Sequence, residues 1–211
     1  MKNYIIHFYF TFLITSLFGQ GEMTIQLHPP DINRGLPVME ALSLRASVTK
    51  FDTTNLSIQD LSDLLWAANG VNRPETGKRT APSALNAQDV DVYVFMKPGI
   101  YLYNANKNIL ENVVIGDYRN LISGRQEYVA KAPVICLLIS DISRFKMEND
   151  SIKLVCAAMD AGIVSQNIAV FCASAGLATR PRVSMDQQKI REILKLKDSQ
   201  YLMINNPVSY K

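Results

Sequence analysis

The stretch KRTAPSALNAQ, residues 78–88, gathers cationic, hydroxyl and carboxamide side chains directly before a strand-like run, DVDVYVFM. Within it, Ser83, Asn86 and Gln88 have the spacing S-x-x-N-x-Q. Carboxamides both donate and accept hydrogen bonds, so they suit a heteroaromatic ring whose edge alternates N–H and C=O groups. Turn residues of the same types also cap their own backbone, and the sequence leaves both interpretations open.

A second polar group lies in the stretch LRASVTKF, where Arg45, Ser47 and Thr49 stand at alternate positions. In an extended segment, residues two apart point to the same side. A guanidinium and hydroxyls on one side suit a phosphate group, because arginine offers a planar fork of charged donors. The alternative is a solvated surface that binds nothing.

The sequence contains very little histidine. Its two histidines are His7, in an apolar N-terminal run, and His28, in a Pro-flanked segment. Ser-His-Asp and Cys-His nucleophiles need a histidine at the site, and zinc needs ligand spacings that this sequence lacks. We therefore expect no metal site and no side-chain hydrolase, so a bound cofactor would have to carry any reaction.

Residues 1–20, MKNYIIHFYFTFLITSLFGQ, have the layout of a secretory signal: one lysine, a mostly apolar run, then small or polar residues. The apolar run is too short to span a bilayer comfortably. We expect cleavage near Gly19 or Gln20 and export to a bacterial periplasm. The alternative is an uncleaved N-terminal anchor.

The composition fits one globular domain, since the chain has 211 residues, of which 48% are apolar and 19% charged. A formal net charge of +3 is too small for nucleic acid to be the main partner. No membrane contact is expected beyond the N-terminal segment. Cys136, Cys156 and Cys172 each have apolar neighbours and are expected to be buried small hydrophobic residues.

Hydrophobic periodicity predicts alternating groups of helices and strands. A long helix over residues 151–177 is apolar on nearly all sides, so we expect it to be buried in the domain centre or at a subunit interface. Residues 71–88 are expected to form a long loop, which is uncommon unless it serves a function. The other helices are expected at 36–44, 57–70, 117–125 and 185–196, and the strands at 90–96, 99–104, 109–114, 133–140 and 200–211.

Four motifs occur in the order found in the nitroreductase superfamily, and the sequence resembles that family over residues 36–211. They are R-x-S-x-x-x-F at 45–51, L-L-W-A-A-N-G at 64–70, P-S-x-x-N-x-Q at 82–88 and A-G-L-A-T at 175–179. The resemblance is strongest to short members related to dehydrogenases that oxidise thiazolines. Residues 21–35 would then be an N-terminal extension between the signal and this domain.

The resemblance implies an α+β fold: a mostly antiparallel sheet wrapped by helices, with a long buried central helix, paired into a homodimer that binds FMN at its interface. Arg45 and Ser47 would bind the phosphate and ribityl chain, and the 83–88 loop would face the ring. The backbone around Arg182 would lie near flavin N5, and Lys211 would be a late phosphate-binding cation. The full implied FMN set is Arg45, Ser47, Thr49, Ser83, Asn86, Gln88, Arg182, Val183 and Lys211.

The activity that the resemblance implies is an FMN-dependent oxidoreductase that passes hydride through flavin N5 to a small organic acceptor by a ping-pong mechanism. No catalytic side chain is expected, because N5 carries the chemistry. NAD(P)H is a candidate electron donor, although not as the free molecule if residues 1–20 direct export. The alternative is a non-catalytic exported dimer that binds flavin or another ligand; Thr49 in place of a third cation and Ser209 in place of a glycine favour it.

Overall fold

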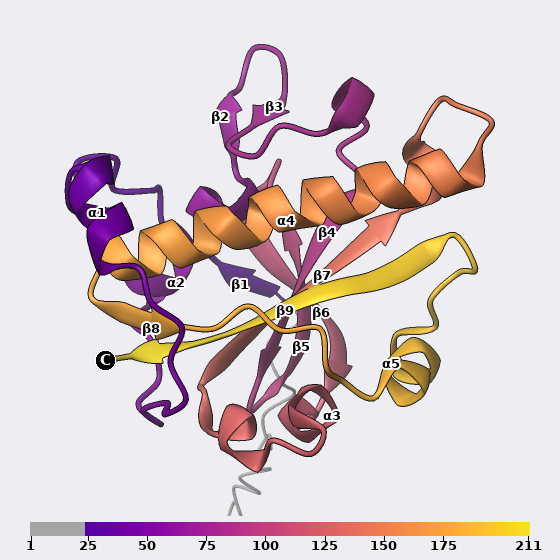
Figure 1. Ribbon diagram of the computed structural model, residues 1–211. Coiled ribbons are helices and arrows are strands. Elements are labelled where there is room, and N and C mark those ends of the chain that lie inside the picture. Colours follow the sequence, from indigo (N-terminus) through magenta and orange to yellow (C-terminus); the bar gives the residue numbers. More distant parts are fainter. Residues whose placement is uncertain (1–23) are drawn as a thin grey trace, which may run out of the picture.

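A seven-stranded sheet forms the centre of the computed structural model, which describes residues 24–211. The strand order is β1-β6-β5-β4-β7-β9-β8, and every neighbouring pair is antiparallel (Figure 1). The expected signal, residues 1–20, lies outside the described residues. The strands of this sheet are β1 (Thr24–Gln26), β4 (Val90–Met96), β5 (Gly99–Asn104), β6 (Ile109–Ile115), β7 (Val134–Asp141), β8 (Leu177–Thr179) and β9 (Gln200–Tyr210).

Helices cover both faces of the sheet. On one face, α2 and α4 pack against strand residues such as Val94 and Leu138; on the other, α3 and α5 pack against residues such as Phe95 and Leu137. The α+β arrangement expected from the sequence is therefore confirmed. The helices are α1 (Val38–Leu44), α2 (Ile58–Asn69), α3 (Arg119–Ser123), α4 (Asp150–Ser174) and α5 (Gln187–Leu194), with short 3₁₀ turns η1 (Ala84–Asn86), η2 (Glu127–Lys131) and η3 (Ile142–Arg144).

Strand β7 lies in the middle of the sheet, between β4 and β9, as its apolar sequence predicts. All eight of its residues are buried. Successive side chains point to opposite faces, and both faces are covered by helices, so the strand has no solvent side that would call for polar residues. This double burial explains the unbroken run VICLLIS.

Helix α2 begins and ends at the residues that the sequence indicates. Ser57 is the N-cap, and its Oγ accepts a hydrogen bond from the Asp60 backbone N–H at 3.0 Å. Gly70 ends the helix, where its N–H donates to the Trp66 carbonyl at 2.8 Å. A Cβ at Gly70 would lie 2.5 Å from the Trp66 side chain, so the close packing of the indole requires glycine.

Residues 71–88 are more ordered than the predicted loop. They form the two-stranded hairpin β2 (Val71–Arg73) and β3 (Lys78–Arg79), followed by η1. The hairpin turns at Gly77, whose φ of +64° favours glycine. Strands of two or three residues are too short to show a hydrophobic period, which is why the sequence pattern did not predict them.

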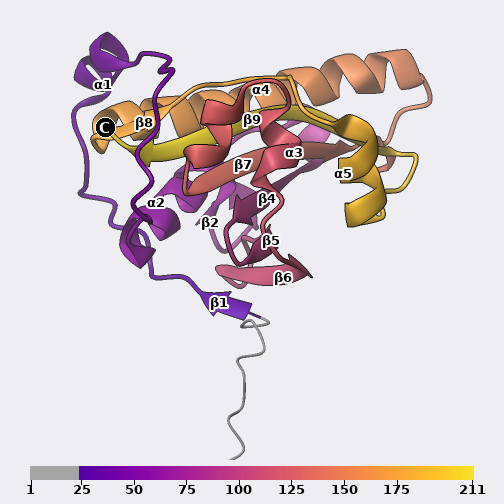
Figure 2. The same ribbon diagram turned by 90° about the horizontal axis from the view of Figure 1, so that it is seen from below.

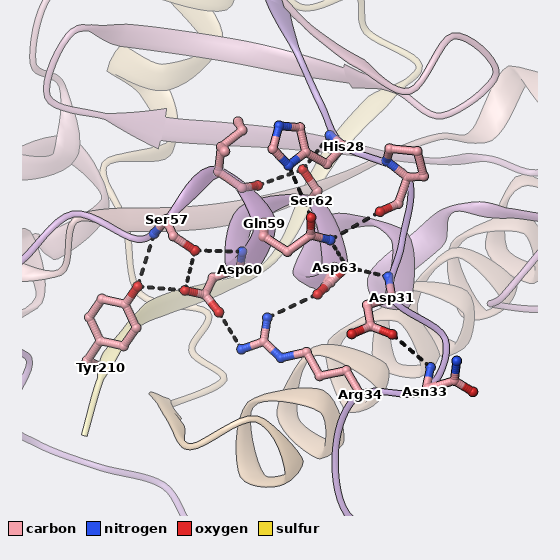
Figure 3. Close-up of polar contacts among 12 residues, drawn as sticks. His28, Asp31, Asn33, Arg34, Ser57, Gln59, Asp60, Ser62, Asp63 and Tyr210 are labelled. Carbon is pink, nitrogen blue, oxygen red and sulfur yellow. Dashed lines mark hydrogen bonds and ion pairs between the residues drawn. The ribbon is translucent and has the colours of Figure 1, made fainter.

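The segment before α1 is attached to the edge of the sheet and to α2. Strand β1 pairs with β6 at the edge of the sheet opposite β8 (Figure 2). Further along, the Arg34 guanidinium binds the carboxylates of Asp60 and Asp63 on α2, and the Tyr210 hydroxyl donates to Asp60 at 2.6 Å (Figure 3). Burial tends to raise the pKa of Asp60, but hydrogen bonds from Ser57, Tyr210 and Arg34 outweigh it and lower that pKa. This network joins the N-terminal segment, α2 and the end of β9.

Helix α4 crosses the sheet with one face buried and part of the other exposed. Ala161, Val164 and Ile168 are buried in the core, whereas Val155 and Met159, in the N-terminal half, are 60% and 64% exposed. The length and hydropathy of α4 would also suit a membrane span, but its contacts with β7, β8 and β9 make it a core helix of this domain. An apolar surface is therefore left on the outer side of α4.

We expect the Arg34→Met substitution to lower the free energy of unfolding by about 1–3 kcal/mol, because it leaves two largely buried carboxylates without their cation. Urea unfolding of the purified chain measures this change. Lys107→Met is the control, since its ion pair with Glu111 is long (3.8 Å) and exposed, and its removal should cost less than about 0.5 kcal/mol. Equal effects of the two substitutions would contradict this account of Arg34.

Candidate functional site

Arg45 and Ser47 lie on an extended segment that follows α1. Arg45 has φ −61° and ψ 121°, and Ser47 forms a parallel bridge with Thr179 of β8. The Val48 N–H donates to the Thr179 carbonyl at 3.2 Å, and the chain bends at Thr49. The extended geometry expected for Arg45 and Ser47 is therefore present, while Thr49 lies where that segment ends.

The same corner of the molecule contains Lys211. Strand β8 pairs with β9, placing Leu177 opposite Tyr210, and Lys211 follows Tyr210 directly. The 45–47 segment, β8 and β9 thus lie side by side, so about 10 Å, two strand spacings, separates the first from the last. Arg45, Ser47 and Lys211 are all exposed. The segments that carry two cations and a hydroxyl, distant in the sequence, therefore meet at this corner.

Ser209 holds this corner in place. Its Oγ accepts from the Asp52 backbone N–H at 3.1 Å and donates to the Tyr210 carbonyl at 2.7 Å. Ser209 is fully buried, and β9 continues through it to Tyr210. The serine that departs from the family pattern therefore fixes the segment after Thr49 against the end of β9.

The loop that contains Ser83 and Asn86 has an unusual backbone. Leu85, Asn86 and Gln88 have φ values of 52°, 53° and 48°, in the left-handed region that non-glycine residues rarely adopt. Such strain persists only where surrounding contacts hold it, and it gathers at functional sites. Leu85 and Asn86 are both exposed, so the loop presents them outward.

Internal hydrogen bonds hold this strained loop. The Ser83 Oγ accepts from the Gln88 N–H at 2.8 Å. The Gln88 carboxamide accepts from Arg79 Nε and donates to the Gly77 carbonyl, each at 3.0 Å. The capping interpretation thus describes Ser83 and Gln88 in this structure, and Asn86 is the loop carboxamide that faces outward.

The Arg182 side chain is buried and hydrogen-bonded to other parts of the protein. The side chain is 7% exposed, and its guanidinium donates to the Gln126 side chain, to the Asn205 side chain and to the carbonyls of Ile122 and Ser123, at 2.9–3.2 Å. Burial lowers its pKa. Arg182 therefore joins α3 and the turn that follows it to β9, and its side chain is occupied without any ligand.

The backbone beside Arg182 remains accessible. Val183 is 69% exposed, and residues 180–184 line a cleft of about 360 Å³ together with Gln126 and Ile204. This cleft is where the resemblance places a flavin N5 contact.

The corner containing Arg45 and the loop containing Asn86 lie at different positions along α4 (Figure 1). The Ala84 N–H donates to Asp160 in the first half of α4 at 2.9 Å, whereas the Leu36 N–H donates to Ser174 at its last residue at 2.6 Å. Asp160 and Ser174 are 14 residues apart, which is roughly 21 Å along a helix. One chain therefore does not bring the two predicted groups together.

Sequence reasoning missed two buried acids next to the loop. Asp89 is fully buried and Asp160 is 4% exposed. Burial, together with the neighbouring Asp160 carboxyl, raises the pKa of Asp89 to about 7, although a hydrogen bond from Ser140 opposes this shift. The available signal was a single acid within the apolar stretch CAAMDAGIV, which an ordinary core helix would not contain.

Residues 42–206 match the family model described as Nitroreductase family. Because this match covers more than half of the chain, the chain belongs to the nitroreductase family, and the resemblance found in the sequence is confirmed. Membership places the protein among the flavin oxidoreductases.

Individual relatives agree with this assignment. The chain is 27% identical over 197 residues to a candidate nitroreductase of Methanocaldococcus jannaschii, covering 89% of this chain and 98% of the relative. Its structure resembles the crystal structure of a candidate nitroreductase from Ralstonia eutropha, with a TM-score of 0.85, 33% identity and 91% of each chain covered. A candidate NAD(P)H:FMN oxidoreductase of Staphylococcus epidermidis shares the fold, with a TM-score of 0.62, 13% identity, and 84% of this chain and 88% of that chain covered.

The contacts of Arg182 and Arg45 predict a large effect of substitution on folding for Arg182 and almost none for Arg45. Arg182→Met should lower the free energy of unfolding by at least about 2 kcal/mol, because it leaves buried carbonyl and carboxamide oxygens without donors. Arg45→Met should change it by less than about 0.5 kcal/mol, because Arg45 is exposed. Urea unfolding of the flavin-free protein gives both values. A stable Arg182→Met variant would show that the Arg182 side chain is not what holds α3 to β9.

Proposed function

We propose that this protein is an FMN-dependent oxidoreductase that works as a homodimer and passes hydride to a small organic acceptor by a ping-pong mechanism. The observation that carries the proposal is the exposed corner formed by Arg45, Ser47 and Lys211 in a chain of the nitroreductase family. The similarity to the candidate NAD(P)H:FMN oxidoreductase of Staphylococcus epidermidis supports FMN as the flavin and NAD(P)H as a candidate donor.

The corner suits the phosphate end of FMN. A phosphate monoester carries close to two negative charges at neutral pH. Arg45 and Lys211 offer two cations on long side chains, from backbone segments about 10 Å apart. Within residues 24–211, neither cation forms an ion pair with an acidic side chain. The Ser47 hydroxyl adds a directional hydrogen bond from the same extended segment.

The ring end would be bound by the 83–88 loop of a second chain. Within one chain, the loop contacts α4 at Asp160, whereas the segment that leads into the corner contacts α4 at Ser174, roughly 21 Å further along the helix. A ligand bound at the corner would therefore reach the loop of a partner chain more directly than the loop of its own chain. Exposed apolar side chains on α1 and α4 support such a pairing, because a dimer would cover them. These residues are Val38, Met39, Leu42, Ile152, Val155 and Met159.

In this arrangement the protein binds and shelters the cofactor. FMN, when bound, supplies hydride transfer through N5, which needs no acid or base from the chain. Asn86 would hydrogen-bond the polar edge of the ring, and the backbone beside Val183 would line the cleft near N5. Exposed Leu85 would lie next to the ring and keep water from it.

Export is part of the proposal, and it rests on the layout of residues 1–20. Outside the cytoplasm free NAD(P)H is scarce, so the electron donor there would be another reduced molecule. A non-catalytic ligand-binding dimer of the same fold is the competing proposal, and the bend at Thr49, where the family often has a third cation, favours it. A purified protein that is colourless and does not take up added FMN would support this competing proposal.

Replacing Arg45 by alanine should weaken FMN binding by about 1.5–3 kcal/mol, the scale of a charge-assisted hydrogen bond, which is roughly 10- to 150-fold in Kd. Titration of the flavin-free protein with FMN, followed by flavin fluorescence, measures this change. Lys50→Ala is the matched control, because it removes an exposed cation from the same segment, outside the Arg45 and Ser47 pair. Unchanged affinity in Arg45→Ala would remove Arg45 from the phosphate site.

Mixed dimers test whether the site takes its two ends from two chains. Arg45→Ala and Asn86→Leu chains, given different tags and purified as a mixed dimer, should bind about half the FMN of the wild-type dimer, because one of its two sites combines an intact Arg45 with an intact Asn86.

The control dimer pairs a chain that has both substitutions with a wild-type chain. If each site spans two chains, both sites of this control dimer are damaged and FMN binding is largely lost. If each site lies within one chain, the results are reversed: the control dimer keeps one intact site and the dimer of single variants keeps none.

A further inference from the structure

Asp89 and Asp160 form a buried carboxyl pair beside the 83–88 loop. Asp89 directly precedes β4, and Asp160 lies in α4. Asp160 lines a small cavity with Gln88 and Val90, the residues on either side of Asp89, and its carboxyl is close enough to help raise the pKa of Asp89. The Ser140 hydroxyl of β7 donates to one oxygen of Asp89, Oδ2. The other oxygen, Oδ1, is buried and accepts no hydrogen bond from any donor in residues 24–211.

A proton on one of the two acids explains how both can be buried next to each other. Two carboxylates in contact in a buried site cannot both be ionised, because each charge disfavours the other and neither is solvated. A hydrogen bond between two carboxyl groups requires that one of them is protonated and donates. The raised pKa of Asp89 makes it the member that holds the proton, which it can donate to the Asp160 carboxylate.

The charged groups around the pair already have other partners. Arg144 on η3 binds the Asp91 carboxylate at 3.0 and 2.6 Å, and it donates to the Gln88 carbonyl at 2.8 Å. Arg79, which lines a small cavity with Asp160, donates to Gln88 and to the Asn69 carbonyl. Asp141, next to Ser140, accepts from Ser143. Among residues 24–211, no cation forms an ion pair with either member, so a proton is what keeps the pair at a single negative charge.

The pair also holds the strained loop. The carboxylate of Asp160 accepts from the backbone N–H of Ala84, the first residue of η1, at 2.9 Å. The left-handed residues Leu85 and Asn86 follow immediately. This hydrogen bond links the loop to α4, so the position of the Asp160 carboxyl decides where the loop begins its turn.

We propose that Asp89 and Asp160 are positioning residues for the 83–88 loop. The proton that they share holds Asp160 against Ala84 and so keeps the loop in the strained conformation that presents Asn86. Loss of that proton releases the loop. The proposal rests on the proposed function only in treating Asn86 as a ligand-binding residue. It makes the loop responsive to pH near neutrality.

The direction of the pH dependence follows from the folded and unfolded states. Burial and the Asp160 carboxyl raise the pKa of Asp89 from 3.8 to about 7 in the folded chain. Between these values the folded chain holds a proton that the unfolded chain has lost, so the stability from the shared proton falls as the pH rises from about 4 to about 7. Above that range the loop should be released more often.

Amide hydrogen exchange of the full-length, flavin-free protein tests this proposal at pH 6 and pH 8, after correction for the intrinsic exchange rate. In the wild type, we expect the protection of peptides covering residues 82–88 to fall by about tenfold or more from pH 6 to pH 8, since release adds an opening reaction. In Asp89→Asn, protection should be equal at the two pH values, because the amide donates to Asp160 in place of the proton and its carbonyl still accepts from Ser140.

Two further variants complete the experiment. Asp160→Asn should also abolish the pH dependence, because its amide donates to Asp89 and its carbonyl accepts from Ala84; it serves if Asp89→Asn does not fold. Asp141→Asn, a change in a neighbouring buried acid outside the pair, should keep the wild-type pH dependence. Equal wild-type protection at both pH values, or a pH dependence that survives in both Asn variants of the pair, overturns the proposal. Because no flavin is present, failure of the proposed FMN binding would not change this result.

Discussion

The burial of β7 on both faces is the constraint on which the rest of this structure depends. A strand with no solvent-facing side needs paired strands at both edges and helices over both faces. Strands β4 and β9 supply the edges, α2 and α4 cover one face, and α3 and α5 cover the other. Because β9 continues to Tyr210 while paired with β8, the backbone leading to Lys211 is held against the sheet. Lys211 is in a defined place for this reason.

The same arrangement explains why the candidate site has two separate parts. The β8–β9 edge gathers the 45–47 segment and Lys211 at one end of α4, while the loop before β4 contacts α4 nearer its start. Helix α4 therefore acts as a rigid spacer within one chain. Its exposed apolar residues lie on the outer side, where a second chain would both cover them and bring its loop toward the corner of the first. Dimerisation and ligand binding would then depend on the same surface.

Local signals were sufficient for much of the fold. The bounds of α2 near Ser57 and Gly70, the strand β7 and the break between β5 and β6 each depend on residues close in sequence, and each was predicted. The β2–β3 hairpin was not, because its strands are too short to have a period. The role of Arg182 was also not predicted: the sequence shows a cation, but whether it faces a ligand or the buried carbonyls of α3 depends on a helix about 60 residues away.

By itself, the sequence determined the family, the order of helices and strands, and the residue types able to bind a phosphorylated ring, because these properties are set by composition and short-range spacing. Only the tertiary structure decided which of those residues are free to act. It buried Arg182, used Ser83 and Gln88 inside their own loop, exposed Asn86, and placed Asp89 against Asp160. The physical reason is that exposure, hydrogen-bond partners and proton affinity depend on neighbours that packing brings from distant parts of the chain.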